Sequence, residues 1–108
     1  MKKFYNKLVR DRIPEIIQAA GREYAVERMD EEEFHQAIRA KLVEEAQEVA
    51  VAAPEDLVTE LADLYEVMDA LMAAYGIKRE IVLTEQKQKQ IERGSFSRRT
   101  RLLWSGAD

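Results

Sequence analysis

The sequence has no cysteine, one histidine and no long apolar run, and each absence removes a class of protein. Without cysteine there is no disulfide and no thiolate metal site, which is compatible with a reducing cytoplasm. The single histidine, His35, argues against a zinc site. No apolar stretch approaches the roughly 20 residues of a membrane span, and no apolar segment follows the basic amino terminus as a secretory signal requires. We therefore expect a cytoplasmic protein without a membrane partner.

The remaining composition is that of a soluble domain. The chain has 108 residues, of which 46% are hydrophobic and 35% charged. This length is enough for one domain that buries roughly two-thirds of its unfolded surface. We expect a single helix-rich domain over residues 1–108.

Charge is strongly segregated along the chain, although the net charge is only −4. Residues 1–12 carry five basic and one acidic side chain, a net of +4. Residues 30–69 carry thirteen acidic and two basic side chains, a net of −11, and residues 78–101 carry eight basic and three acidic, a net of +5. An acidic centre between basic ends suits a metal ion with a phosphorylated ligand. Mutual neutralisation of acidic and basic helices is the structural alternative.

Capping and helix-breaking residues divide the chain into four predicted helices, at about 14–20, 31–53, 54–75 and 78–93. Asp30 followed by Glu33 has the pattern of a capping box at the start of the first long helix. Pro54 starts the second long helix and Gly76 ends it. The connection between the long helices is short, so we expect them to be antiparallel neighbours.

The predicted fold class is all-α, an antiparallel helix bundle of two long helices with shorter N- and C-terminal helices. Tyr24 to Met29 alternates weakly and predicts a strand or an extended segment, and the tail from Phe96 to Trp104 predicts a strand or a subunit contact. One short β-pair from the ends is therefore an option. The second long helix is apolar over much of its circumference, which one partner helix cannot cover. We expect a homodimer or homotetramer.

Two helical E-x-x-[E/D] pairs stand 15 residues apart, Glu45 with Glu48 and Glu60 with Asp63. The first carboxylate of each pair shares a helix face with aliphatic side chains three, four and seven residues away. An unpaired carboxylate taken out of water is costly. With an antiparallel turn centred near residues 53–54, all four carboxylates come within side-chain reach. An all-oxygen site of this kind suits Mg²⁺, or alternatively Mn²⁺, rather than zinc or copper.

The charged residues are also compatible with other kinds of protein. A single E-x-x-E is common on a solvated helix face. A non-enzymatic helical oligomerisation or regulatory module that binds a basic partner needs an exposed acidic stripe, whereas Glu45 and Glu60 have apolar neighbours. A di-iron centre needs E-x-x-H on two helices, and no histidine follows here. Nucleic-acid binding through Arg98-Arg99-Thr100-Arg101 is disfavoured, because the cluster is short and the protein is acidic.

Three segments carry a resemblance to a known family. Glu44-Glu45-Ala46-Gln47-Glu48 followed by Glu60-Leu61-Ala62-Asp63 resembles the EExxE…ExxD motif of the all-α nucleoside triphosphate pyrophosphatases, a superfamily that includes MazG. Asn6-Lys7-Leu8-Val9-Arg10-Asp11-Arg12-Ile13-Pro14 and Glu92-Arg93-Gly94-Ser95-Phe96 resemble its phosphoribosyl-ATP pyrophosphohydrolase-like, house-cleaning branch. The resemblance reaches from residue 6 to residue 96.

The resemblance implies Mg²⁺-dependent hydrolysis of a nucleoside triphosphate to the monophosphate and pyrophosphate. By motif, Glu45, Glu48, Glu60 and Asp63 would be the metal ligands. Glu44 would be a ligand to a further metal or would orient water. Either Glu48 or Glu44 would accept the proton of the attacking water.

Two further expectations concern the substrate. Phosphate contacts are expected from the two basic ends of the chain, through Arg10, Lys87 and Arg93. Phosphoribosyl-ATP pyrophosphohydrolases usually have a Tyr-His pair after their Ala-Asp-Leu, whereas this chain has Tyr65-Glu66. This departure favours a free nucleotide over phosphoribosyl-ATP as the substrate.

Overall fold

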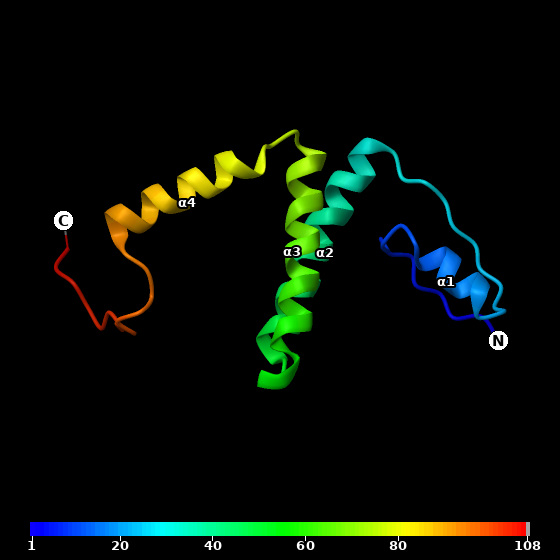
Figure 1. The fold of residues 1–108 in the computed structure, drawn as a ribbon, viewed down its shortest axis with the longest axis horizontal. Helices are drawn as coiled ribbons and strands as arrows, with labels where there is room; N and C mark the ends of the chain where they lie inside the picture. The colour runs from blue at the N-terminus through cyan, green and yellow to red at the C-terminus, as the bar shows by residue number, and fades with distance from the viewer. Residues whose placement is uncertain (108) are drawn as a thin grey trace. The chain divides into compact units, whose positions relative to one another are not determined.

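The computed structural model describes residues 1–107 and is helical (Figure 1). Its elements are α1 (Ile13–Ala19), α2 (Glu31–Val51), the 3₁₀ turn η1 (Pro54–Asp56), α3 (Leu57–Ala74) and α4 (Arg79–Arg93). The all-α prediction is confirmed, with four α-helices in these residues. Two compact units make up the chain, Met1–Gly76 and Ile77–Asp108.

Helices α2 and α3 form the centre of the first unit and run antiparallel along each other (Figure 1). The predicted capping box is present at the start of α2. The Asp30 carboxylate accepts from the Glu33 backbone N–H at 2.8 Å, and the Glu33 side chain accepts from the Asp30 N–H at 3.3 Å. These bonds satisfy two N–H groups that a helix start otherwise leaves unpaired.

The connection between α2 and α3 differs slightly from the predicted one. Helix α2 ends at Val51, because Ala52 and Ala53 are extended, with ψ of 142° and 151°. The residue before a proline is sterically disfavoured in the helical region, which explains Ala53. Pro54 opens a 3₁₀ turn before α3 begins at Leu57, and such turns are frequent at helix starts. Gly76, with φ of +65°, follows α3 where the sequence places its end.

His35 ties the start of α2 to the end of α3. Its Nε2 lies 3.0 Å from the carbonyl oxygen of Ala74, and its ring stacks on that of Tyr75 at a centroid distance of 4.3 Å. Arg39 donates from Nε to the Tyr75 hydroxyl at 3.0 Å. His35 therefore connects the two helices at this end of the pair.

Tyr24 to Met29 and the tail from Phe96 to Trp104 form no strand, which leaves the extended-segment alternative for the first and the subunit-contact alternative for the second. Residues 22–30 have no regular secondary structure, and residues 1–107 contain no strand. The optional β-pair is therefore absent from this part of the chain, and an isolated extended segment has no ladder to stabilise it. None of the helices in residues 1–107 combines the length and the apolarity that crossing a membrane requires.

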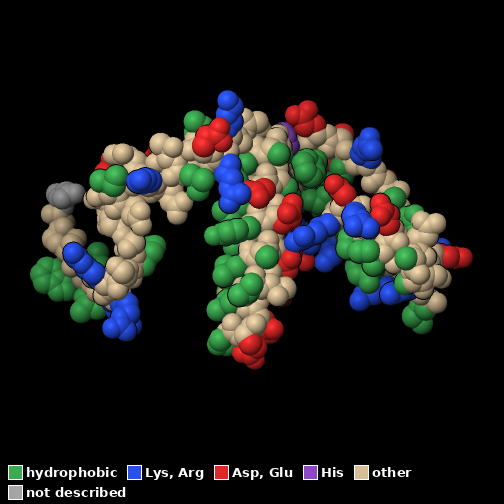
Figure 2. Space-filling view, in the orientation of Figure 1, with side chains coloured by type: hydrophobic (Ala, Val, Ile, Leu, Met, Phe, Trp, Pro, Cys, Tyr) green, Lys and Arg blue, Asp and Glu red, His purple; other side chains and the backbone are tan. Residues whose placement is uncertain are grey.

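Little of the chain is buried. Ile38 on α2 and Val67 on α3, exposed by 3% and 7%, are the buried hydrophobic residues. Figure 2 shows hydrophobic side chains uncovered along α3. They include Val58, Leu61, Tyr65 and Met68, and Val58 is 81% exposed. The helix pair thus positions side chains at its seam but shelters only a small core.

Candidate metal centre

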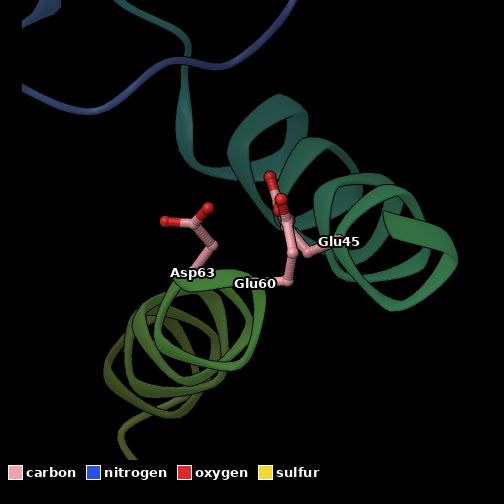
Figure 3. Close-up of side chains that lie close together, drawn as sticks. All are labelled: Glu45, Glu60 and Asp63. Atoms are coloured by element: carbon pink, nitrogen blue, oxygen red, sulfur yellow. The ribbon is translucent and has the colours of Figure 1, made fainter. Parts of the chain in front are cut away.

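Three carboxylates meet where α2 faces α3 (Figure 3). Glu45 projects from α2, and Glu60 and Asp63 project from α3 on the same side of the pair. Each offers one oxygen, and these oxygens lie within 4.8 Å of one another. All three residues are partly buried, and the Glu45 side chain is only 13% exposed.

The sequence brings these groups together through helix geometry. Glu60 and Asp63 are three residues apart, so they lie on one face of α3, one turn from each other. Glu45 stands on the α2 face that carries Ile38, seven residues earlier, and Ile38 is buried against the neighbouring helix. The antiparallel turn then sets Glu45 opposite Glu60 and Asp63, as predicted from the length of the connection.

The electrostatics of the cluster are unfavourable without a cation. The pKa of Glu60 is raised, first by removal of its carboxylate from water and then by the negative charges of Asp63, Glu48, Glu45 and Asp56. Both causes penalise the ionised form. A bound cation would remove this penalty by pairing with the converging charges.

Glu48 stands at the edge of this cluster. It is exposed, and its carboxylate is not one of the three that lie within 4.8 Å of one another. Its charge nevertheless contributes to the raised pKa of Glu60. The Glu48 carboxylate makes no hydrogen bond or ion pair with another residue in the described part of the chain.

Two cationic side chains already contact the cluster. Arg10, from the segment before α1, donates from Nη2 to Asp63 Oδ1 at 2.7 Å. Lys41, one turn before Glu45 on α2, places its Nζ 3.5 Å from Glu45 Oε1. Arg10 and Lys41 therefore neutralise part of the negative charge of the cluster. Glu60 is in neither of these two ion pairs.

Glu44 lies beside the cluster and is held by lysines. Lys7 donates from Nζ to Glu44 Oε1 at 3.1 Å, and Lys41 Nζ lies 3.5 Å from Glu44 Oε2. The pKa of Glu44 is lowered, mainly by the hydrogen bond from Lys7 and further by the charge of Lys41, which outweigh partial burial. Glu44 thus remains ionised and already has partners.

A cavity of about 180 Å³ opens next to Glu44 and Lys41. Its apolar lining comes from Leu8, Met29, Ala37 and Ala40, and its polar lining from Asn6, Lys7, Lys41 and Glu44. Lys41 lines this cavity and also contacts Glu45, so the cavity lies next to the carboxylate cluster. The site therefore combines converging negative charge with an adjacent, mostly apolar recess.

The three predicted phosphate ligands fall in different units. Arg10 is at the cluster, whereas Lys87 and Arg93 lie on α4 in the second unit, where they are exposed. Sequence reasoning missed Lys7 and Lys41. Lys41 has a local signal, because it precedes Glu45 by four residues on one helix. Lys7 has none, because its partner is 37 residues away.

Comparisons with known proteins give the chain a family. A protein of Mycolicibacterium smegmatis (strain ATCC 700084 / mc(2)155), described as uncharacterized, is 43% identical over 54 residues. The match covers 50% of this chain and 55% of that relative, so the chain spans about half the length of the curated relative. No solved structure matches. The profile of the phosphoribosyl-ATP pyrophosphohydrolase family matches residues 5–90, and the chain belongs to this family, within the MazG-like nucleoside triphosphate pyrophosphatase superfamily.

Proposed function

We propose that this protein is a Mg²⁺-dependent nucleoside triphosphate pyrophosphohydrolase that converts a ribo- or deoxyribonucleoside triphosphate and water into the monophosphate and pyrophosphate. The observation that carries the proposal is the meeting of Glu45, Glu60 and Asp63, whose oxygens lie within 4.8 Å of one another. Membership of a pyrophosphohydrolase family supports a hydrolase acting on a phosphoric anhydride bond. We assign it a house-cleaning role in the nucleotide pool of the cytoplasm.

The donor set fits a hard divalent cation. All the converging atoms are carboxylate oxygens, the ligands that Mg²⁺ and Mn²⁺ prefer, and no thiolate is present in the sequence. Glu45, Glu60 and Asp63 would hold the ion, and Glu48 would join from the edge of the cluster. When bound, the ion supplies charge neutralisation for the polyphosphate and lowers the pKa of a water molecule.

Glu48 would have a second role besides that of an edge ligand, and Glu44 would have a role outside the ligand set. Glu48 would accept the proton of the water that attacks the α-phosphorus, because its carboxylate is exposed and unpaired in the described residues. Glu44 would position Lys7 and Lys41, because both lysines contact its carboxylate. Pyrophosphate then leaves with its negative charge stabilised by nearby cations.

The substrate is proposed to lie across the cluster and the neighbouring cavity. Arg10 would contact a phosphate, since its guanidinium already reaches Asp63. Lys87 and Arg93 would add phosphate contacts, a role supported only by the basic charge of their region. The cavity of about 180 Å³ is below the size of a complete small-molecule pocket. We assign it to the base of a free nucleotide, with Asn6 and the lysines at its polar lining.

The active protein is proposed to be a homodimer or homotetramer. The strongest support is the apolar surface of α3, where Val58 is 81% exposed and Tyr65 58% exposed. Isolated apolar residues on a surface are ordinary, but a row of them on one helix is typical of an interface. A second copy of the chain would cover this row.

A nucleotide panel with a matched pair of variants tests the function. Canonical and modified nucleoside triphosphates are assayed for pyrophosphate release with Mg²⁺ and with chelator. We expect Mg²⁺-dependent release that Glu45→Gln abolishes and Glu66→Gln, an exposed glutamate of α3, leaves unchanged. Circular dichroism checks that both variants keep their helices. Release that is independent of metal, or that survives in Glu45→Gln, contradicts the assigned metal site. No release from any nucleotide in the panel contradicts the enzymatic function and favours the non-enzymatic module.

A further inference from the structure

The N-terminal segment (residues 6–12) crosses to the carboxylates of the helix pair. Arg10 reaches Asp63 over 53 residues of sequence at 2.7 Å, and Lys7 reaches Glu44 over 37 residues at 3.1 Å. Both contacts lie within the first unit. The proposed metal ligand Asp63 is therefore already the partner of a cation that belongs to the chain.

A guanidinium and a divalent cation compete for the same carboxylate. Both are positive, and two like charges a few ångströms apart repel each other strongly where water is partly excluded. A metal ion bound to Asp63 would displace the Arg10 side chain, which is 55% exposed and long enough to turn elsewhere. Arginine is also well suited to bind phosphate, because its planar fork donates two parallel hydrogen bonds.

We propose that Arg10 couples metal binding to nucleotide binding by exchanging one anionic partner for another. Without ligands it is the counter-ion of Asp63 and weakens metal binding. With metal on the carboxylates, its guanidinium is released and binds a phosphate of the nucleotide. This inference rests on the proposed function and adds a coupling between the two ligands of that site.

The exchange has a thermodynamic consequence. Whichever ligand arrives first must break the Arg10–Asp63 pair, and the second ligand then binds without that cost. Metal and nucleotide therefore favour each other's binding, and the coupling is reciprocal. Arg10→Gln removes both the competing charge and the phosphate contact, so it should strengthen metal binding and weaken nucleotide binding.

The test measures binding in the full-length protein, without turnover. Mn²⁺ alone is titrated by calorimetry, and a non-hydrolysable nucleoside triphosphate analogue is titrated with chelator and with saturating Mn²⁺. We expect Arg10→Gln to bind Mn²⁺ about two- to five-fold more tightly, the range of an exposed ion pair. We expect it to bind the analogue about tenfold more weakly when Mn²⁺ is present, the loss of a charge-assisted hydrogen bond.

Arg12→Gln is the matched control. It removes the same charge from the same segment, and Arg12 pairs locally with Glu15 at 3.2 Å rather than with the cluster. Arg12→Gln should therefore behave like the unmodified protein in all three titrations. Arg10→Lys, which keeps the charge without the planar fork, should restore the weaker Mn²⁺ binding but only part of the analogue affinity.

The outcomes separate this inference from the proposed function. If the unmodified protein binds neither Mn²⁺ nor the analogue, both are overturned. If it binds both, but Arg10→Gln matches Arg12→Gln, the exchange is overturned and the proposed function stands. Weaker Mn²⁺ binding by Arg10→Gln also overturns the exchange, because Arg10 would then support the metal site instead of competing for it.

Discussion

The two units of the chain differ in whether they contain a candidate functional site. In the first unit, α2 and α3 supply the carboxylates and Lys41, and the segment before α1 adds Lys7 and Arg10 beside a cavity. In the second unit, every described residue is exposed, including the whole of α4. The first unit therefore assembles a candidate site, whereas the second presents only surface.

Both units leave large hydrophobic side chains exposed to solvent. The first unit also leaves a row of apolar side chains open along α3, and the second exposes Ile91, Phe96 and Trp104 by 71%, 96% and 82%. Neither unit buries enough apolar area to account for a stable fold by itself, since burial is the main favourable contribution to folding. The candidate site is thus assembled within one chain, whereas the hydrophobic core is proposed to be shared between chains.

The largest expected effect comes from placing charge in the proposed subunit interface on α3. Val58→Asp would bury an unpaired carboxylate, costing several kcal/mol per subunit, in place of a valine worth about 1.5–3 kcal/mol. We expect the oligomer to dissociate at micromolar concentration. Because a single chain buries so little, dissociation should be accompanied by loss of cooperative unfolding. Light scattering and thermal melts by circular dichroism measure the two effects.

A matched pair in the second unit tells whether the shared core extends there. Ile91 and Gln90 are adjacent, exposed residues of α4. If α4 contributes to the interface, Ile91→Asp weakens assembly and Gln90→Asp does not. An oligomer that is equally stable in both variants confines the interface to the first unit. An unaltered oligomer in Val58→Asp contradicts the shared core altogether.

The features of the fold and the site that the sequence predicts are those determined by neighbouring residues, through helix capping and helix periodicity. Asp30 and Glu33 signal a helix start from neighbouring residues, and helix periodicity places Glu60 and Asp63 on one face. A short turn between two helices then leaves few ways to arrange them. These constraints were sufficient to predict the meeting of Glu45 with Glu60 and Asp63.

The parts that sequence does not predict depend on irregular backbone. The segment that carries Lys7 and Arg10 has no hydrophobic period that fixes its path, so its contacts with Glu44 and Asp63 are visible only in three dimensions. The sequence leaves Tyr24 to Met29 open between a strand and an extended segment for a related reason, because pairing depends on a second strand, and residues 1–107 supply none. Helix geometry and the motif both predict Glu48 among the converging carboxylates, whereas the group within 4.8 Å consists of Glu45, Glu60 and Asp63. The position of Glu48 at the edge depends on side-chain reach.

The next largest effect is expected from Mg²⁺ binding, which should stabilise the first unit and leave the second unchanged. At a hundredfold excess of Mg²⁺ over its Kd, binding to the folded state stabilises it by about 2.7 kcal/mol, or on the order of 10 °C in Tm for a chain of this size. Hydrogen exchange should slow in α2 and α3 around the carboxylates and stay unchanged in α4. Glu60→Gln should abolish the Mg²⁺ effect.

Glu60→Gln should also change Tm in opposite directions with and without Mg²⁺. The raised pKa of Glu60 means that its ionised form is disfavoured in the folded protein without metal. Glu60→Gln should therefore melt at a slightly higher temperature than the unmodified protein in chelator, although it melts lower in Mg²⁺. A variant that is less stable under both conditions would assign Glu60 a packing role instead. If Mg²⁺ slowed hydrogen exchange equally in both units, the metal site would not be confined to the first unit.

The smallest expected effect concerns the Lys7–Glu44 pair and its dependence on pH. The lowered pKa of Glu44 means that the folded protein holds its carboxylate ionised more strongly than the unfolded chain does. Its contribution to stability is therefore complete above the ordinary glutamate pKa and is lost as pH falls through the lowered value. Lys7→Met should reduce Tm near neutral pH by at most a few degrees, the range of an exposed ion pair.

In acid, below the lowered pKa, the melting temperatures of Lys7→Met and the unmodified protein should converge, because Glu44 is then neutral in both. Lys89→Met supplies the comparison from the second unit, since Lys89 is exposed on α4 and forms no ion pair in residues 1–107. Its Tm should follow that of the unmodified protein at every pH. A Lys7→Met deficit that persists unchanged in acid would mean that Lys7 acts by packing, through its alkyl chain at the cavity, rather than by its charge.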